Sequence, residues 1–332
     1  MNEQDILFIT AEYYPAANIR QIKILGNRII VEMQNLAETP EITERLKQRL
    51  AQEFPQHKSN IVFVEDKTVN LSTQALEKWQ INGVKKIIGV ASGKGGVGKS
   101  TTAVNLALAL ANLGKKVALA DADIYGPSIP TMLGYEGAPL TTVDGEYFKP
   151  FQEYGIKSVS IGALIDRNTP LIWRGSMACN AIQQLLTQTD WGEIDIMVID
   201  MPPGTGDIQI TLSQRLEFAG IVIVSTPQDI ALIDAIKGVN MFKQIGAPIL
   251  GIVENMSYFI CPHCGERAHI FGHDGAKQTA EKMGETFLGA IPLEPEIRAT
   301  SDAGTPIVAE NPDSPHTKAY EDIAAQIIRR IG

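Results

Sequence analysis

The segment at residues 87–101, IIGVASGKGGVGKST, constrains the fold more than any other stretch of this chain. Its first five residues are mostly branched and apolar, which is typical of a strand buried in a parallel sheet. A glycine-rich loop follows at once and fits the pattern G-x-x-x-x-G-K-[ST]. In such a loop backbone N–H groups surround phosphate oxygens, the lysine reaches the β- and γ-phosphates, and the hydroxyl can bind Mg²⁺. The segment therefore predicts a nucleotide site with Lys99 and Ser100 at the phosphates.

The next residues, TTAVNLALALANLG at 101–114, favour a helix that stops at Gly114. The positive end of its dipole would then point at the bound phosphates. Strand, loop and helix stand in the order that the pattern requires. We therefore expect the nucleotide to contact the whole loop, which consists of Gly93, Lys94, Gly95, Gly96, Val97, Gly98, Lys99, Ser100 and Thr101.

A second lysine, Lys94, occupies the first variable position of the loop and gives the sequence KGGVGK. With this deviant Walker A signature the chain resembles a family of dimeric ATPases that includes nitrogenase iron protein, the septum-site and plasmid-partitioning ATPases, and the Mrp/ApbC iron–sulfur carriers. The resemblance implies a homodimer that binds ATP, in which Lys94 crosses to the partner's nucleotide. A cation supplied in this way would act like an arginine finger and stabilise charge during phosphoryl transfer. The alternative is that Lys94 is a solvated loop lysine.

Three aspartates follow two further apolar runs. Residues 117–120 lead into Asp121 and Asp123, and residues 194–199 lead into Asp200. The carboxyl ends of parallel strands meet where α/β sheets bind ligands, so these carboxylates are expected beside the nucleotide. Asp200 is expected to hold Mg²⁺ together with Ser100, and either Asp121 or Asp123 could orient the attacking water. Two solvated aspartates are the alternative at 121 and 123.

The run at residues 191–207, WGEIDIMVIDMPPGTGD, is similar to the signature of the Mrp/ApbC branch. Within that branch the resemblance favours Asp123 for water activation, with Lys94, Lys99 and Asp123 as the catalytic set. Asn255 follows another strand, where its amide could read the edge of adenine, and the resemblance supports this role. The stretch Trp173-Arg174-Gly175 also resembles the branch, although a structural ion pair is an equal alternative for Arg174.

A C-x-x-C pair, Cys261 and Cys264, follows Asn255 closely and places two thiolates on one turn. The family resemblance implies a 4Fe-4S cluster there. A cubane cluster generally takes four thiolates, which a symmetric dimer would supply as two from each chain. Zinc is the alternative, because His269 and His273 could complete a four-ligand site within one chain. A redox pair is a third interpretation. The remaining cysteine, Cys179, lies in a predicted helix, where we expect a packed hydrophobe.

The alternation of strands and helices along residues 85–332 predicts an α/β fold with a doubly wound, mostly parallel sheet of seven strands. This P-loop ATPase domain would carry the C-x-x-C as a metal-binding insert near 261–264. Residues 1–65 predict a small α+β domain of order β-β-α-β, which looks like the domain that precedes the ATPase in Mrp proteins. It lacks the cysteine that this family often has after Thr-Pro. Residues 66–84 are expected to form a linker.

The composition of the chain argues against some classes of binding partner. The net charge of −9 over 332 residues argues against nucleic acid, whose phosphates need clustered Lys and Arg. No uniformly apolar stretch reaches membrane-spanning length, and the first residues lack a signal peptide's basic start, so we expect a cytoplasmic protein that does not bind a membrane. The terminal residues 316–332 carry an apolar stripe with few basic residues, which favours a helix packed on the sheet.

These observations together predict an ATP-binding and ATP-hydrolysing carrier. It would hold an iron–sulfur cluster at a homodimer interface, receive it from donor proteins and transfer it to apo-proteins. Two alternatives remain open from the sequence: a deviant Walker A ATPase with structural zinc at the C-x-x-C, or a spatial-partitioning ATPase of the septum or plasmid type.

Overall fold

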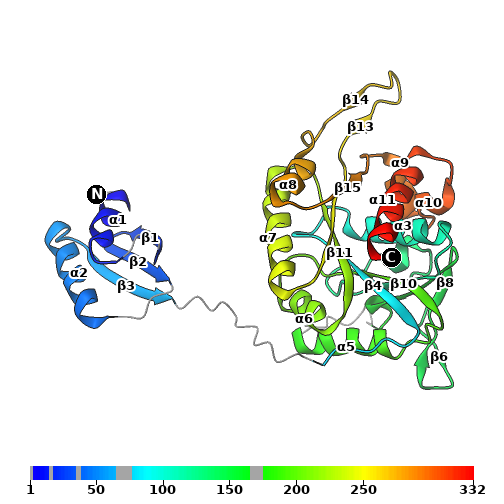
Figure 1. Cartoon of the computed structure of the whole chain (residues 1–332), viewed down its shortest axis with the longest axis horizontal. Helices are drawn as coiled ribbons and strands as arrows, with labels where there is room; N and C mark the ends of the chain where they lie inside the picture. The colour runs from blue at the N-terminus through cyan, green and yellow to red at the C-terminus, as the bar shows by residue number, and fades with distance from the viewer. Residues whose placement is uncertain (1–2, 15–17, 35–38, 65–76, 165–174) are drawn as a thin grey trace. The chain divides into compact units, whose positions relative to one another are not determined.

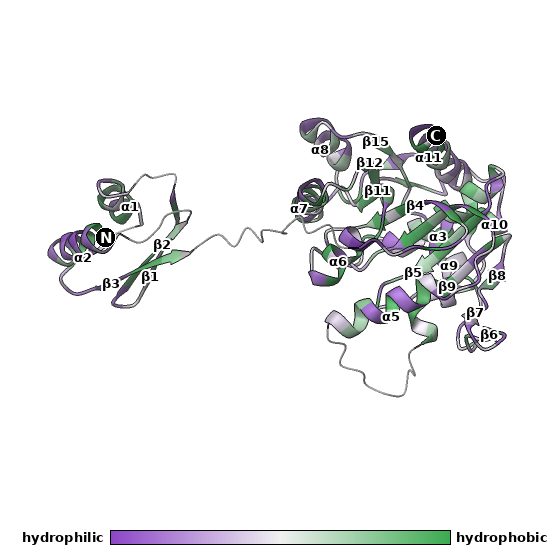
Figure 2. Cartoon of the chain, turned by 60° about the horizontal axis from the view of Figure 1, so that its bottom comes forward, coloured by the Kyte–Doolittle hydropathy of each residue, from purple (hydrophilic) through white to green (hydrophobic). Residues whose placement is uncertain are grey.

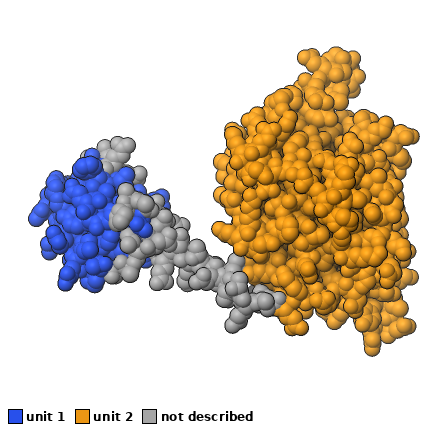
Figure 3. Space-filling view, viewed as in Figure 1, with its two compact units in different colours: residues 1–75 blue, residues 76–332 orange. Residues whose placement is uncertain are grey.

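The computed structural model describes residues 3–14, 18–34, 39–64, 77–164 and 175–332 (Figure 1). The chain divides into two compact units, residues 1–75 and 76–332, each with its own hydrophobic core (Figure 3). Part of the expected linker, residues 66–76, lies outside the described residues. Its last part belongs to the large unit, because the Trp79 N–H donates to the Arg215 carbonyl at 2.8 Å and Ile81 is buried in the core.

Among its described residues the small unit has a three-stranded sheet of order β1-β2-β3 covered by two helices. The elements are α1 (Glu3–Ala11), β1 (Ile19–Leu25), β2 (Arg28–Gln34), α2 (Pro40–Glu53) and β3 (Lys58–Val64). The turn at Gly26 (φ +59°) joins β1 and β2 as an antiparallel hairpin, whereas β3 runs parallel to β2 after the α2 crossover. Along the chain α1 comes first, where no helix was expected, and the hairpin, α2 and β3 come after it.

Helix α1 closes the core of the small unit. Ile6 is fully buried and belongs to the same hydrophobic core as Ile29 and Met33 of β2 and Leu46 of α2. Nearby, the Tyr14 hydroxyl and the Thr43 hydroxyl form a buried hydrogen bond of 2.9 Å. The apolar residues of α1 are therefore explained by their burial in the core of the small unit.

The large unit is built around an eight-stranded sheet of order β15-β12-β11-β4-β10-β5-β9-β8. Its elements in chain order are β4 (Val84–Ala91), α3 (Lys99–Asn112), β5 (Val117–Asp121), α4 (Ile129–Met132), β6 (Thr142–Val143), β7 (Tyr147–Phe148), β8 (Phe151–Glu153), β9 (Ile156–Ser160), the 3₁₀ turn η2 (Ile161–Ala163), α5 (Gly175–Thr187), β10 (Ile194–Asp200), α6 (Asp207–Arg215), β11 (Phe218–Ser225), α7 (Asp229–Ile245), β12 (Ile249–Glu254), β13 (Phe259–Ile260), β14 (Arg267–Ala268), α8 (Gly275–Met283), β15 (Phe287–Ala290), α9 (Pro295–Asp302), α10 (Ile307–Glu310) and α11 (Pro315–Ile331).

Seven of these strands are parallel to one another and are the seven that the sequence predicts, so the fold class is confirmed. The eighth, β8, pairs antiparallel with β9 at the edge and was missed. It is three residues long and turns at Tyr154 and Gly155, both with positive φ, which is the signature of a tight hairpin. The short β6–β7 hairpin turns in the same way at Asp144 and Gly145.

Helices cover both faces of the sheet, and the side chains of strand β4 show which helices lie on each face. Ile88 and Val90 join the core that contains α3 and α11, whereas Ile87 and Ala91 join the core that contains α5, α6, α7 and α8. This alternation is that of a strand buried on both faces. In Figure 2 the central strands of this sheet are mainly hydrophobic, whereas the helices around it carry many hydrophilic residues. Helix α11 was expected to pack on the sheet; it contacts β15 of the sheet, but it packs mainly against α3.

None of the helices in the described ranges combines the length with the apolar composition that crossing a bilayer requires.

The two cores yield a first prediction. Leu46→Ala removes a fully buried side chain from the small unit and should lower that unit's free energy of unfolding by about 2–5 kcal/mol. The large unit should keep its melting transition, because its core contains no residue of the small unit. Calorimetry of the full chain measures both transitions. The matched control is Val62→Ala on exposed strand surface, and equal losses from the two substitutions would contradict the packing described.

Candidate functional site

The predicted phosphate loop lies between β4 and α3, and its glycines are required by close contacts. Gly98 has φ +80°, and a Cβ there would lie 2.0 Å from the Asn255 Nδ2. A Cβ on Gly93 would lie 2.2 Å from the backbone of Asp234 in α7. Larger residues at either position would displace the loop, so the sequence fixes its path between two neighbouring elements.

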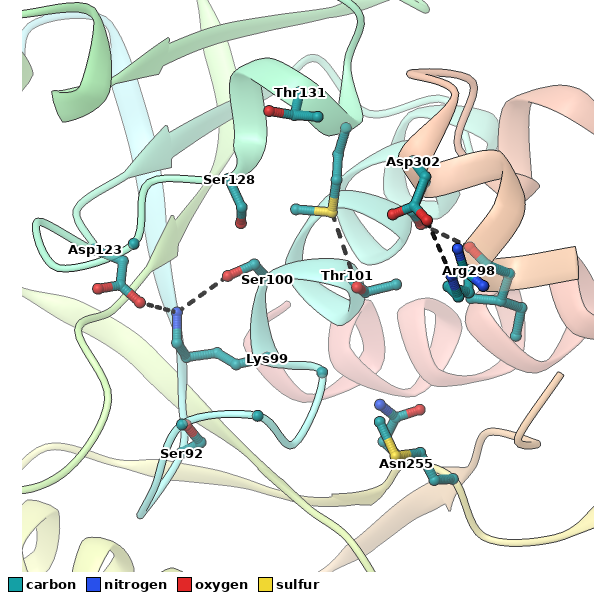
Figure 4. Close-up of a pocket in the computed structure, with 18 of the residues that line it drawn as sticks. Ser92, Lys99, Ser100, Thr101, Asp123, Ser128, Thr131, Asn255, Arg298 and Asp302 are labelled. Carbon is teal, nitrogen blue, oxygen red and sulfur yellow. Dashed lines mark hydrogen bonds and ion pairs between the residues drawn. The ribbon is translucent and has the colours of Figure 1, made fainter. Parts of the chain in front are cut away.

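The N-terminus of α3 faces a cavity of about 560 Å³ at the carboxyl ends of the strands (Figure 4). This is where parallel sheets bind ligands. The predicted loop residues that line it are Gly95, Gly96, Gly98, Lys99, Ser100 and Thr101, together with Asp123 and Asn255. Of the predicted set, Gly93, Lys94, Val97 and Asp200 are not part of the lining.

Strand register explains why the aspartates meet Lys99. In the sheet, Asp200 at the end of β10 pairs with Asp121 at the end of β5. The Lys99 Nζ lies 2.6 Å from Asp200 Oδ1 and 3.3 Å from Asp123 Oδ2. It also lies 3.3 Å from the Ser100 Oγ (Figure 4). Burial lowers the pKa of Lys99, but Asp200 and Asp123 raise that pKa by more, so the ammonium stays charged.

The buried aspartates differ in their hydrogen bonding. Asp121 accepts hydrogen bonds from the Asp123 N–H, the Ile129 N–H and the Ser160 hydroxyl, so it shapes the turn beneath the cavity. Burial, assisted by the Asp200 charge, raises the pKa of Asp121 to about 7. Burial also raises the pKa of Asp200, although the Lys99 charge opposes this. Asp123 lines the cavity and is the carboxylate that can face a nucleotide.

The donor set fits Mg²⁺. The second carboxylate oxygen of Asp200, Oδ2, is buried without a hydrogen-bond partner, which leaves it available to the cation or to a water that the cation holds. The Ser100 hydroxyl and Asp200 both lie against the Lys99 ammonium. Oxygen ligands of this kind are those that Mg²⁺ takes beside nucleotide phosphates.

Asn255 follows β12 and supports the loop directly, because its Nδ2 donates to the Val97 carbonyl at 2.8 Å. It also lines the cavity (Figure 4). That its amide reads adenine stays a prediction. Sequence reasoning missed the rest of this wall, which consists of Met256, Pro292, Leu293, Glu294, Ile297, Arg298, Ser301 and Asp302. The one local signal was Pro292, which directly follows the last strand of the sheet.

Lys94 is placed differently from Lys99. It is half-buried, its side chain is absent from the cavity lining, and its Nζ has no hydrogen-bond or ion-pair partner in the described part of the chain. Its backbone carbonyl accepts a hydrogen bond of 2.8 Å from the Ser92 hydroxyl, which fixes the start of the loop. Within the described residues, the chain's own site therefore makes no use of the Lys94 charge.

The C-x-x-C lies in a hairpin of β13 and β14 that projects from the large unit beside α8 (Figure 1). The Cys261 N–H donates to the Glu266 carbonyl at 2.9 Å, and the Gly265 N–H donates to the Cys261 carbonyl at 2.8 Å. Cys264 is exposed and Cys261 is half-buried. Hydrogen bonds from the Cys264 and His263 backbone hold the pKa of the Cys261 thiol below its ordinary value, which favours the thiolate that metals bind.

The zinc alternative needs both histidines beside the cysteines. The rings of His269 and His273 lie 4.1 Å apart, but no group of three or more His, Cys, Asp or Glu residues capable of holding a metal ion occurs within the described residues. Cys179 is buried in the core beside Ile182, as predicted. Trp173 and Arg174 lie outside the described residues.

Comparison with known proteins agrees with this geometry. Residues 83–328 match the family described as "ParA: NUBPL iron-transfer P-loop NTPase". The chain belongs to this family. Over 256 residues it is 54% identical to the iron-sulfur cluster transfer protein NUBPL of Dictyostelium discoideum, covering 76% of this chain and 79% of that protein. Over 251 residues it is 53% identical to the iron-sulfur cluster carrier protein of Escherichia coli K12, covering 76% and 68%.

Solved structures of similar proteins share the fold of the large unit. A nucleotide-binding protein of Archaeoglobus fulgidus in complex with ADP is 39% identical, with a TM-score of 0.62 over 70% of this chain and 91% of that one. The cell-division ATPase MinD of Pyrococcus furiosus is 24% identical, with a TM-score of 0.57 over 74% and 98%. The second likeness concerns the fold alone.

Lys99→Met tests the nucleotide site because it keeps the apolar stem of the side chain and removes its charge. ATP affinity should fall at least about a hundredfold, as expected when a buried phosphate loses its cation. The nucleotide-free protein should also lose roughly 3 kcal/mol of stability, since Asp200 and Asp123 are left without their partner. Fluorescent-ATP titration and thermal melting measure both effects. The exposed Lys318→Met serves as the control, and wild-type affinity in Lys99→Met would refute the assignment.

Proposed function

We propose that this chain binds and hydrolyses ATP and carries an iron–sulfur cluster, which two copies hold between them and deliver to apo-proteins. The observation that carries the proposal is the projecting cysteine hairpin, because it offers two thiolates on a segment that follows the cavity-lining Asn255 and Met256 in the chain. Relatives more than 50% identical over three quarters of this chain are named as iron–sulfur carrier or transfer proteins. The names of these relatives support an iron–sulfur cluster as the cargo of this chain.

The number of ligands supports an assembly of two chains. A 4Fe-4S cluster takes four thiolates. Cys261 and Cys264 supply two, and Cys179 is buried in the core. Two copies related by a two-fold axis would present the same hairpin to each other and complete the set. The cluster would thus be bound only where two chains meet, and separation or distortion of that contact would release it to an apo-protein.

The nucleotide half of the mechanism uses the residues around Lys99. The Lys99 ammonium would bind the β- and γ-phosphates, and Ser100 and Asp200 would hold Mg²⁺, which neutralises charge on the phosphates when bound. Asp123, at the edge of the cavity, would orient the attacking water. Lys94, whose charge is unpaired in the described structure, would reach the partner's nucleotide. ATP binding and cluster binding would then both depend on the same pairing of chains.

Anaerobic reconstitution with iron and sulfide tests the cargo. The wild-type protein should turn brown, contain about four iron atoms per dimer and elute as a dimer. Cys261→Ala/Cys264→Ala should remain colourless, because it lacks every exposed thiolate. Cys179→Ala is the matched control and should load like the wild type, since that thiol is buried and the pKa of Cys179 is raised by burial.

Metal analysis and absorption distinguish the alternatives. A colourless protein with about one zinc per chain would contradict the carrier and favour a structural metal site, because Zn²⁺ is d¹⁰ and has no visible colour. Equal colour in the double variant and the wild type would show that the cluster is bound elsewhere.

A further inference from the structure

One buried carboxylate joins the two ends of the segment that carries the cysteine hairpin. Glu254, the last residue of β12, is completely buried. Its Oε1 accepts a hydrogen bond of 2.5 Å from the Ser257 hydroxyl, just before the hairpin. Its Oε2 accepts a hydrogen bond of 2.6 Å from the Ala276 N–H, just after the hairpin. The residues before and after the hairpin are therefore both hydrogen-bonded to the last residue of β12.

The second of these bonds replaces a helix cap. Ala276 lies in the first turn of α8, whose N–H groups need an acceptor. The adjacent Asp274 makes no capping hydrogen bond with its side chain, so the acceptor comes from Glu254 in a different element. Glu254 has no ion pair with a cation in the described residues, and the positive end of the α8 dipole is what compensates its charge. Removing the carboxylate would leave two buried donors unpaired.

The next residue in the chain reaches the nucleotide site. Asn255 donates to the Val97 carbonyl of the phosphate loop, and Asn255 and Met256 both line the cavity. Two neighbouring residues at the end of β12 therefore bind different segments: Asn255 is hydrogen-bonded to the phosphate loop, and Glu254 is hydrogen-bonded to the base of the hairpin. If the nucleotide displaced this strand end, both the phosphate loop and the base of the hairpin would move.

The stem of the hairpin is also hydrogen-bonded to the segment that forms part of the cavity wall. The Ser257 N–H donates to the Ile291 carbonyl at 2.9 Å, and the Leu293 N–H donates to the Tyr258 carbonyl at 2.7 Å. Leu293 lines the nucleotide cavity. From the other side, the Arg267 guanidinium of β14 lies 3.8 Å from the centre of the Tyr258 ring. Backbone and side-chain contacts therefore run without interruption from the cavity wall to the returning strand of the hairpin.

We propose that Glu254 is a positioning residue that couples nucleotide binding at Asn255 to the placement of the cysteine hairpin, so that the exposure of the Cys261 and Cys264 thiols depends on the bound nucleotide. Its use in cluster transfer rests on the proposed function above. The coupling itself belongs to the cluster-free chain, in which ATP would favour one of two arrangements of the strand end and hairpin.

Thiol reactivity in the cluster-free protein tests this directly. In a Cys179→Ala background only the hairpin thiols remain, and their alkylation by iodoacetamide is followed with and without Mg²⁺ and ATP. With Glu254 present, the nucleotide should change the alkylation rate at least about fivefold, the lower end of typical couplings between sites. With Glu254→Ala the ratio of the two rates should fall toward one, because the carboxylate that ties Ser257 and Ala276 together at the end of β12 is gone.

Two further variants separate positioning from general damage to the fold. Glu254→Gln can still accept from the Ala276 N–H and can donate to the Ser257 Oγ, so it should keep the nucleotide response. Glu285→Ala is the matched control, because it removes a carboxylate that bonds to Lys243 at 2.6 Å near the other end of α8. It should also keep the response. ATP affinity is measured for every variant, and Glu254→Ala should bind ATP within about threefold of its parent, since Asn255 is intact.

The outcomes distinguish this proposal from the proposed function. Equal alkylation rates with and without nucleotide in the parent protein would overturn the coupling, whether or not the protein binds a cluster. An unchanged nucleotide response in Glu254→Ala, or its loss in Glu254→Gln to the same extent as in Glu254→Ala, would overturn the role of Glu254. A parent that shows the response but takes up no cluster would sustain the coupling and contradict the carrier.

Discussion

The structure depends on a single buried ammonium surrounded by carboxylates. Lys99 stands where the ends of β5 and β10 meet the start of α3, and without it Asp200 and Asp123 would be buried with their charges uncompensated. Such an arrangement is stable only if strand register, loop path and helix start agree. The same ammonium would bind a nucleotide phosphate, so the ion pairs that stabilise the phosphate loop also hold a cation in place for that phosphate.

Two features of the large unit lack a complete set of partners among the described residues. The Lys94 ammonium has no partner there, and the hairpin supplies two cysteines where a cubane cluster needs four. In the proposed function, a second copy related by a two-fold axis would complete each of them. The stretch from Glu254 to Leu293 connects the nucleotide cavity with the cysteine hairpin, which gives a physical route by which the state of one could alter the other.

Local pattern was sufficient for much of the fold and for half of the site. The seven parallel strands and the phosphate loop could be read because each is encoded in a run of neighbouring residues. Helix α1 and strand β8 could not, since α1 is stabilised by the sheet it covers and β8 is three residues long. Other parts of the site join segments that are distant in the sequence, so no residue spacing predicts them. They are the cavity wall of Met256, Leu293 and Ile297 and the hydrogen bond from the Ala276 N–H to Glu254.

The most direct test of a site shared between two chains is the ATPase activity of a mixture of Lys94→Ala and Lys99→Met. Each variant alone should be inactive, the first without the crossing lysine and the second without phosphate binding. In a mixed dimer the Lys99 site of one chain receives Lys94 from the other, so an equal mixture should recover roughly a quarter of the wild-type rate, half the dimers being mixed with one working site each. A mixture no more active than its separate components would contradict the shared site.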